Sequence, residues 1–260
     1  MTESLVRIER HDGGVAEVVL DRPEAMNAVS TAMAQALVAA GEELRADTSV
    51  RAVVVTSSHP KAFCVGADLK ERNGFSDDDL RAQRPGNRLA YRALYDLPVP
   101  TIAAVDGHAL GGGCEIALAC DLIVAGPRAS FALPEVSVGV IPGGGGTQLL
   151  TRRIGWSRAA DLIFTARRIA GEEGARLGLV DRFVADAKGE ALAMAATIAQ
   201  HSPIGVRNAK AAMRAGSDVT VDEGLDIEDA CWHDTAFSAD RAEGVRAFAE
   251  KRAPRWPGLS

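Results

Sequence analysis

The chain has 260 residues, 47% of them hydrophobic, so it can bury a full core as one domain with a small additional unit. Lys and Arg total 29 against 35 Asp and Glu, a formal net charge of −6. This balance argues against general affinity for nucleic acid, which depends on neutralising phosphates. Pro142 and glycines interrupt the uncharged run 136–151, which excludes it as a membrane span. The N-terminal residues show neither a signal core nor a transit pattern, so we expect a cytoplasmic location.

Apolar periodicity and turn residues predict the following elements in chain order. Strands are expected at 15–20, 51–56, 101–105, 122–125 and 130–133, with helices at 30–45, 77–95 and 114–120. Beyond residue 146 the pattern is mainly helical, with one strand at 179–184 and helices at 191–201, 203–215, 221–235 and 238–252. Strands that alternate with helices predict a mixed α/β layer fold.

The four cysteines show no CxxC pair and no spacing that would combine with histidines as a zinc site. We therefore expect free, mostly buried thiols and no metal. Cys114 stands next to Glu115, but a small core residue on a helix is a better interpretation than a nucleophile. The five histidines form no ligand spacing either, and we assign them no chemistry.

A glycine-rich turn, GHALGGGCE at 107–115, is followed twenty residues later by a second acid, Glu135. The turn lacks the Lys-Ser/Thr of a phosphate-binding loop and the GxGxxG spacing of a dinucleotide site. Its glycines instead place unpaired amides at a helix N-terminus, where N–H groups and the helix dipole favour negative charge. This arrangement is typical of one half of an oxyanion hole. A tight turn alone would explain the glycines, but not the carboxylate at Glu115.

Four segments resemble the crotonase family, the enoyl-CoA hydratases and isomerases: AFCVGADLKE, GHALGGGCEIALACDLIVA, LPEVSVGVIPGGGGTQ and EGVRAFAEKRAP. The match runs in order from LDRPEAMNAV to the EKR tail. The resemblance implies a spiral of repeated ββα units followed by a C-terminal helical region that forms trimers, often paired into hexamers. We accordingly expect an acyl-CoA-binding core at 1–190 and an oligomerisation region at 191–260.

The resemblance also implies the chemistry. Ala67 and Gly112 match the positions whose backbone amides hold the thioester oxygen, and removing one such donor typically costs about 10²–10³ in rate. Glu115 and Glu135 match the two glutamates that hold the attacking water, with Gly143 as a backbone contact to the same water. Neighbouring carboxylates push their pKa values apart. We expect Glu115 to act as base toward water and Glu135 to donate a proton to the α carbon, although one concerted relay could use both.

Coenzyme A is expected as part of the substrate, with no separate cofactor. The positions that match CoA contacts in the family are Ala25, Met26, Ala67, Asp68, Leu69, Lys70, Phe248 and Lys251. The chain departs from its relatives at Glu24, where many have lysine, so one phosphate contact is missing or replaced by arginine.

Several alternatives remain open. Because both acids are present, hydration is favoured over double-bond isomerisation. Segments such as GADLKER and LPVPTIAA resemble the 3-methylglutaconyl-CoA hydratase branch, which leaves branched-chain amino-acid breakdown as an alternative to fatty-acid β-oxidation. Some members of that branch also bind AU-rich RNA, but the net charge and the two tyrosines argue against RNA binding here. A non-catalytic scaffold is the last alternative. The acyl group, and the choice between trimer and hexamer, are left open.

Overall fold

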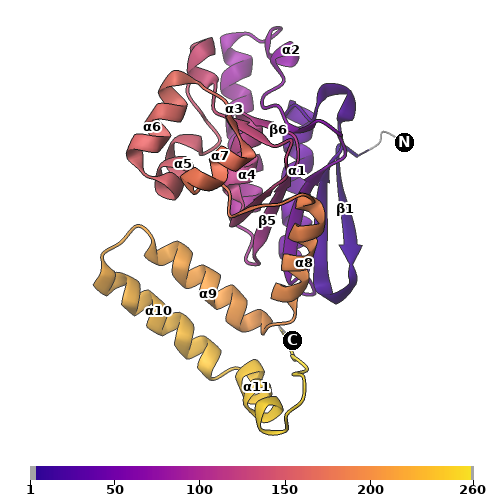
Figure 1. The fold of residues 1–260 in the computed structure, drawn as a ribbon, viewed down its shortest axis with the longest axis vertical. Helices are drawn as coiled ribbons and strands as arrows, with labels where there is room; N and C mark the ends of the chain where they lie inside the picture. The colour runs from indigo at the N-terminus through magenta and orange to yellow at the C-terminus, as the bar shows by residue number, and fades with distance from the viewer. Residues whose placement is uncertain (1–3, 259–260) are drawn as a thin grey trace.

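The computed structural model describes residues 4–258, whose strands form two sheets (Figure 1). The larger sheet has the order β1-β2-β3-β5-β7-β10, with strands Val6–His11, Val15–Leu20, Ala52–Ser57, Thr101–Val105, Leu122–Ala125 and Arg182–Phe183. The smaller sheet has the order β4-β6-β8-β9, with strands Ala62–Cys64, His108–Leu110, Ser130–Ala132 and Ile169–Ala170. From β2 to β10 the neighbours in the larger sheet are parallel, whereas β1 is antiparallel to β2.

Successive turns of the chain follow one plan. Each contributes a strand to the larger sheet, then a strand to the smaller sheet, then a helical segment: β3, β4 and α2–α3; β5, β6 and α4; β7, β8 and η3. The helical elements of this region are η1 Asp12–Gly14, η2 Pro23–Ala25, α1 Thr31–Ala46, α2 Leu69–Arg72, α3 Asp77–Tyr95, α4 Gly112–Ala119, η3 Glu135–Val138, α5 Gly146–Ile154, α6 Trp156–Thr165, α7 Gly171–Leu177 and α8 Ala187–Ala199. The predicted spiral of ββα units is confirmed.

The central strands are buried on both faces, as parallel strands usually are. Side chains alternate between faces along β3. Val53 and Val55 belong to the main core, which also includes residues of α1, α3 and α4, whereas Val54 packs with alanines of α8 on the other face. Helix α8, which packs on the sheet, runs from Ala187 to Ala199 and so crosses the expected boundary between residues 190 and 191. The division into a core and an oligomerisation region at that boundary stays a prediction.

The remaining helices are α9 Pro203–Gly216, α10 Val221–Ala236 and α11 Ala239–Ala249, which extend away from the sheets (Figure 1). The second half of α9 is joined by ion pairs to Asp121, the residue before β7. Asp121 accepts hydrogen bonds from Lys210 Nζ and Arg214 Nη2, both at 2.7 Å. The C-terminal helical region is therefore present, as expected.

One predicted strand is largely wrong. Of the expected segment 179–184, only β10 is a strand, because the end of α7 takes up the residues before it. Gly178 adopts a left-handed conformation, with φ of 85°, and the N–H groups of Leu179 and Val180 both donate to the Gly174 carbonyl, which closes the helix.

The cysteine prediction is confirmed: Cys64, Cys114 and Cys120 are buried, Cys231 is half-buried, and all four are free. Burial raises the pKa of the Cys114 thiol, which suits a core residue. Between residues 4 and 258, no helix combines the length and the apolar character that a membrane crossing requires.

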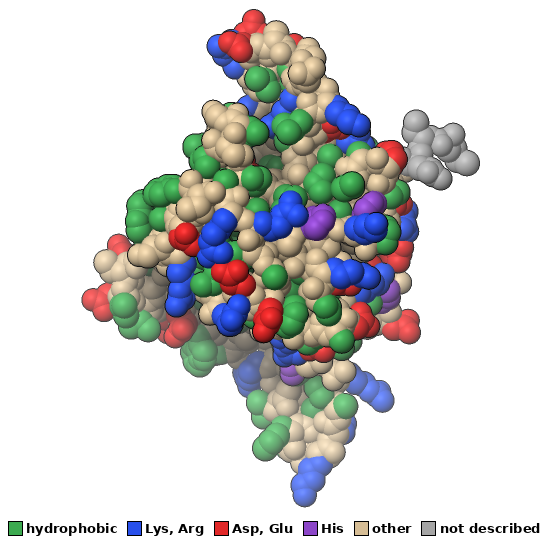
Figure 2. All heavy atoms as spheres, turned by 45° about the horizontal axis from the view of Figure 1, so that its top comes forward, with side chains coloured by type: hydrophobic (Ala, Val, Ile, Leu, Met, Phe, Trp, Pro, Cys, Tyr) green, Lys and Arg blue, Asp and Glu red, His purple; other side chains and the backbone are tan. Residues whose placement is uncertain are grey.

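Charged side chains of both signs are interspersed on the face drawn in Figure 2. Sequence spacing did not reveal that Glu9, His11 and Glu17 converge, with potential ligand atoms within 4.8 Å. Glu17 is fully buried, accepts a hydrogen bond from Thr56 and pairs with Lys188 at 2.5 Å, so its charge is already compensated.

Candidate active site

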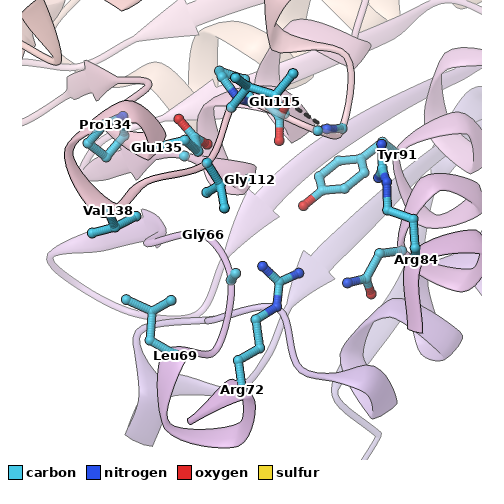
Figure 3. A pocket seen from close by; sticks show the side chains of 18 of the residues that line it. Gly66, Leu69, Arg72, Arg84, Tyr91, Gly112, Glu115, Pro134, Glu135 and Val138 are labelled. Atoms are coloured by element: carbon cyan, nitrogen blue, oxygen red, sulfur yellow. Dashed lines mark hydrogen bonds between the residues drawn. The ribbon is translucent and has the colours of Figure 1, made fainter. Parts of the chain in front are cut away.

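A pocket of about 730 Å³ lies between the helical segments that follow the smaller sheet (Figure 3). Its walls come from the loop after β4, from α2 and α3, from the start of α4, and from η3 with the loop that leads to α5. Four of the sequence-predicted positions outside the CoA set line it: Gly112, Glu115, Glu135 and Gly143. Ala67 and Leu69, two of the predicted CoA contacts, line it as well.

Glu115 lies in the first turn of α4 and is 3% exposed. Its Oε1 accepts hydrogen bonds from the backbone N–H groups of Gly144, at 2.6 Å, and Gly146, at 2.8 Å. Burial raises the pKa of Glu115, while those amides and the charge of Arg84 act in the opposite direction. The carboxylate is thus fixed in position by backbone donors rather than by an ion pair.

Glu135 opens η3, directly after β8 and Pro134. Its Oε1 lies against Gly111, since a Cβ placed on that glycine would be 3.0 Å away. Its Oε2 is buried and has no hydrogen-bond partner among residues 4–258. Burial, together with the nearby charge of Glu115, raises the pKa of Glu135 to about 7. This carboxyl can therefore hold or release a proton near neutral pH.

The two predicted oxyanion positions lie on adjacent segments. The bridge between Val29 and Ala67 uses the Gly66 carbonyl and the Asp68 N–H, which leaves the Ala67 N–H outside it. Gly112 is the first residue of α4, so its N–H has no partner within the helix. The close approach of these two segments requires glycine at position 66. Gly66 has a φ of +92°, and a Cβ there would lie 2.8 Å from the Leu110 carbonyl oxygen and 3.1 Å from the Gly112 nitrogen.

The pocket residues that sequence reasoning did not name include Arg72, Arg84, Asn87 and Tyr91. Arg84, Asn87 and Tyr91 lie on one face of α3, at spacings of three and four residues. Tyr91 is buried, and a Cβ on Gly112 would come within 2.4 Å of its hydroxyl. Asn87 is also buried, and its Oδ1 has no partner among the described residues. The polar, helically spaced face of the 77–95 helix was the available signal.

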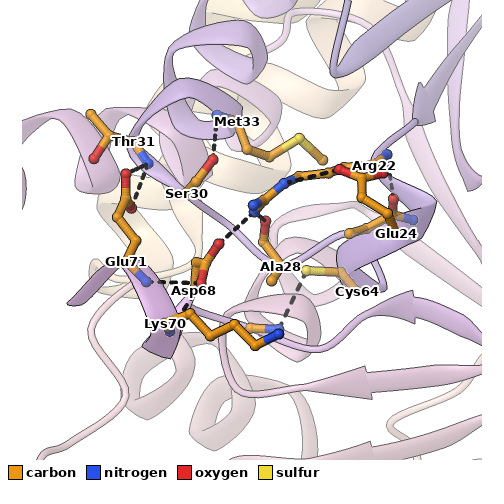
Figure 4. A network of polar contacts seen from close by, with 12 residues as sticks. Arg22, Glu24, Ala28, Ser30, Thr31, Met33, Cys64, Asp68, Lys70 and Glu71 are labelled. Atoms are coloured by element: carbon orange, nitrogen blue, oxygen red, sulfur yellow. Dashed lines mark hydrogen bonds and ion pairs between the residues drawn. The ribbon is translucent and has the colours of Figure 1, made fainter. Parts of the chain in front are cut away.

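The predicted CoA contacts Asp68 and Lys70 belong to a network of polar contacts with Arg22 and Glu71 (Figure 4). The Met26 carbonyl accepts a hydrogen bond from the Val65 N–H, which brings η2 against the loop before α2. Asp68 faces inward: its carboxylate caps α2 and accepts from Arg22 Nη1 at 2.7 Å. Burial alone would raise the pKa of Asp68, but the backbone donors of α2 and Arg22 outweigh it and lower that pKa. Lys70 is exposed.

Two predicted CoA contacts are not brought to the pocket by this chain. Phe248, which is 88% exposed, lies on α11, and Lys251 follows it. In Figure 1, α11 lies at the opposite end of the molecule from α2. The roles of both residues therefore stay predictions that need a second copy of the chain.

The amino-acid sequence is similar to curated proteins along most of its length. One relative is a protein from Arabidopsis thaliana named probable enoyl-CoA hydratase 2, mitochondrial. The two sequences are 42% identical, and the match covers 98% of this chain and 85% of the relative. Another relative is the Mus musculus protein named methylglutaconyl-CoA hydratase, mitochondrial. The two sequences are 40% identical, and the match covers 99% of this chain and 85% of the relative. These names contradict the expected cytoplasmic location. That expectation was wrong because it rested on the lack of a targeting pattern in the N-terminal residues, and such an absence does not determine the compartment to which a protein is delivered.

The structure is similar to solved structures as well. A crystal structure of enoyl-CoA hydratase from Bacillus anthracis matches with a TM-score of 0.95 and 38% identity, covering 98% of this chain and 100% of that one. A family model described as enoyl-CoA hydratase/isomerase matches residues 10–258. Together with the two glutamates and the two free amides in one pocket, these matches show that the chain belongs to the enoyl-CoA hydratase/isomerase family.

Proposed function

We propose that the protein is a hydro-lyase that adds water reversibly across the 2,3 double bond of an enoyl-CoA thioester, giving a 3-hydroxyacyl-CoA. The observation that carries this proposal is the convergence of Glu115 and Glu135 on one pocket, beside the N–H groups of Ala67 and Gly112, which take no part in the bridge to Val29 or in the hydrogen bonds of α4. Addition of water to a conjugated thioester needs a base, a proton donor and stabilisation of the charge that develops on the thioester oxygen.

The environments of the two acids support separate roles. Backbone donors from Gly144 and Gly146 stabilise an ionised Glu115, which takes a proton from the attacking water as its oxygen bonds to the β carbon. Glu135 lacks such donors on Oε2, and its pKa of about 7 leaves much of it protonated at neutral pH, so it donates a proton to the α carbon. The amides of Ala67 and Gly112 meanwhile stabilise the enolate oxygen. No electrons leave the substrate, so the reaction as written needs no redox cofactor.

The test is the loss of conjugated enoyl-thioester absorbance from crotonyl-CoA with the wild type, Glu115→Gln and Glu135→Gln. We expect turnover by the wild type and a loss of about 10²–10⁴ in each variant. Glu42→Gln, which changes an exposed acid on α1, is the matched control and should retain full activity. A folded wild-type protein that binds CoA but bleaches no enoyl-CoA would overturn the hydratase proposal.

Hydration of 3-methylglutaconyl-CoA is the second candidate, favoured by the 40% identity with the Mus musculus enzyme of that name. Parallel assays with this thioester and crotonyl-CoA distinguish the two substrates. Isomerisation is a less favoured alternative, and product analysis separates it, because an isomerase moves the double bond without incorporating oxygen from water.

We also propose that the chain assembles as a trimer, or as a hexamer made of two trimers. Large apolar side chains are exposed on the C-terminal helices: Met213, Val221, Leu225, Trp232, Phe237, Val245 and Phe248. Covering this surface with a second copy removes it from water and offers a route by which Phe248 and Lys251 reach a neighbouring CoA site. Light scattering tests the assembly, and a monomer at assay concentrations would contradict it.

A further inference from the structure

The pocket carries positive charge that the hydration reaction does not require. Arg72 projects from α2 toward the centre of the pocket, across from the two glutamates, and Arg84 lies beside Tyr91 on the α3 wall (Figure 3). We infer that Arg72 and Arg84 determine substrate specificity by binding a carboxylate at the far end of the acyl chain. The inference rests on the proposed function, which it deepens by naming a substrate class: enoyl-CoA thioesters of dicarboxylic acids.

Arg84 has no ion-pair partner among residues 4–258, in contrast to other arginines on the same helix. Arg81 pairs with Asp78, and Arg92 pairs with Asp96 at 2.8 Å. Arg72 forms no ion pair within the described residues either, and only its Nε is used, in a bond of 3.2 Å to Gln83. Both guanidinium groups therefore keep donors available to a ligand.

Arg84 is also close to the reacting part of the pocket. A Cβ placed on Gly143 would lie 3.4 Å from Arg84 Nη1, so the guanidinium lies against the backbone segment that holds Glu115. A substrate group that meets Arg84 must then belong to the acyl chain. The phosphates of CoA are separated from the reacting carbons by the whole pantetheine arm.

The surrounding wall suits a short acyl chain with one charged end. Leu69, Leu80, Val138 and Ile141 line the pocket and supply an apolar surface for the methylene groups. A guanidinium binds a carboxylate through two parallel hydrogen bonds, which makes arginine the preferred residue for recognising this group. Arg72 is half-buried and Arg84 is exposed, so a carboxylate at the end of the acyl chain replaces water at guanidinium groups that the protein itself leaves unpaired among residues 4–258.

Asn87 adds a polar group to the same wall. It is buried, it lies one helical turn from Arg84, and its Oδ1 has no partner among the described residues. Its side-chain amide can hydrogen-bond to the ligand or to a water that the carboxylate holds.

The experiment compares kcat/KM for glutaconyl-CoA, which ends in a carboxylate, with kcat/KM for crotonyl-CoA, which does not. We expect the wild type to favour glutaconyl-CoA. The ratio of the two values should fall by about ten- to hundredfold in Arg84→Gln and in Arg72→Gln, the usual effect of losing a hydrogen bond to a charged group. Arg84→Lys should fall in between, because it keeps the charge but loses the paired geometry.

Arg88→Gln is the matched control, because Arg88 is exposed on the same helix and does not line this pocket. It removes one positive charge and should leave the ratio unchanged. Comparing the ratio of the two kcat/KM values also corrects for any effect of Arg84 on Glu115, because a change in Glu115 would alter the hydration of both substrates alike.

The outcomes separate this inference from the proposed function. Turnover of crotonyl-CoA with no preference for glutaconyl-CoA, and with the same ratio in every variant, overturns the inference and leaves the hydratase intact. Turnover of neither thioester overturns the hydratase. In that case, calorimetric binding of the saturated analogues glutaryl-CoA and butyryl-CoA decides the inference, which requires tighter binding of glutaryl-CoA that is lost in Arg84→Gln.

Discussion

Two groups of buried or half-buried acids in this protein have opposite surroundings. Beside the second half of α9, Asp121 is held by Lys210 and Arg214 and also accepts a hydrogen bond from the Thr101 N–H. Burial alone would favour its neutral form, yet the two cations outweigh burial and lower the pKa of Asp121. In the pocket, neither Glu115 nor Glu135 has an ion-pair partner among residues 4–258, and burial raises both pKa values.

The contrast indicates what each group does. An acid that is paired with cations, here called compensated, stays ionised at little cost in folding free energy, and Asp121 in this way joins two parts of the fold. An uncompensated acid destabilises the fold, and a protein retains it where the proton itself is needed. The same residue type can therefore serve structure or catalysis, depending on whether cations or only backbone amides and apolar groups surround it.

The largest effect on stability is expected from removing the compensated acid. Asp121→Ala leaves Lys210 and Arg214 without their carboxylate, and such a change typically costs about 3–5 kcal/mol in the free energy of unfolding. Urea denaturation measures it. The control is Asp218→Ala, which breaks an exposed pair with Arg152 and should cost less than about 1 kcal/mol. Equal losses in the two variants would contradict the structural role of Asp121.

The pH dependence of the reaction is expected to follow the uncompensated acid. Glu135 donates its proton only while protonated, so activity is present below its pKa of about 7 and is lost as the pH rises through that value. We expect kcat/KM for hydration to fall by about tenfold per pH unit on the alkaline side. The profile is measured with crotonyl-CoA between about pH 5.5 and 9. A profile that stays flat to pH 9 is incompatible with Glu135 as the donor.

The smallest effect concerns stability at the pocket. In the unfolded chain Glu135 ionises near its ordinary pKa of 4.5, whereas in the folded protein it ionises near 7. Folding therefore becomes less favourable as the pH rises from about 4.5 to 7, and the penalty persists above that range. Glu135→Gln should increase the free energy of unfolding at pH 8 by about 1–2 kcal/mol, an amount reduced for the remaining solvent contact of this half-buried side chain. At pH 4 the two proteins should be equally stable.

Much of this organisation could be predicted from the sequence where local signals are strong. The helix expected at 77–95 has the observed bounds, because Ser76 and Asp79 form a capping box and Pro98 and Pro100 follow its end. Strand 101–105 was likewise predicted with its observed bounds. The convergence of Glu115 and Glu135 came from the family resemblance, and the structure places both in one pocket.

Other features could not be predicted because they depend on distant contacts. Strands β4 and β6 have three residues each, too few for an alternating pattern to stand out. The position of Arg72 depends on how α2 meets α3, and the unpaired state of Arg84 depends on which acids the fold brings near it. Periodicity placed Arg84 on a helix but could not show that its face lines the pocket.

The most direct test measures stability and activity of Glu135→Gln on the same sample at pH 8. If Glu135 is retained because it donates a proton, Glu135→Gln should be more stable than the wild type and should hydrate crotonyl-CoA at least about a hundredfold more slowly. A variant that loses stability along with activity would show that Glu135 supports the fold, and would contradict the distinction between compensated and uncompensated acids.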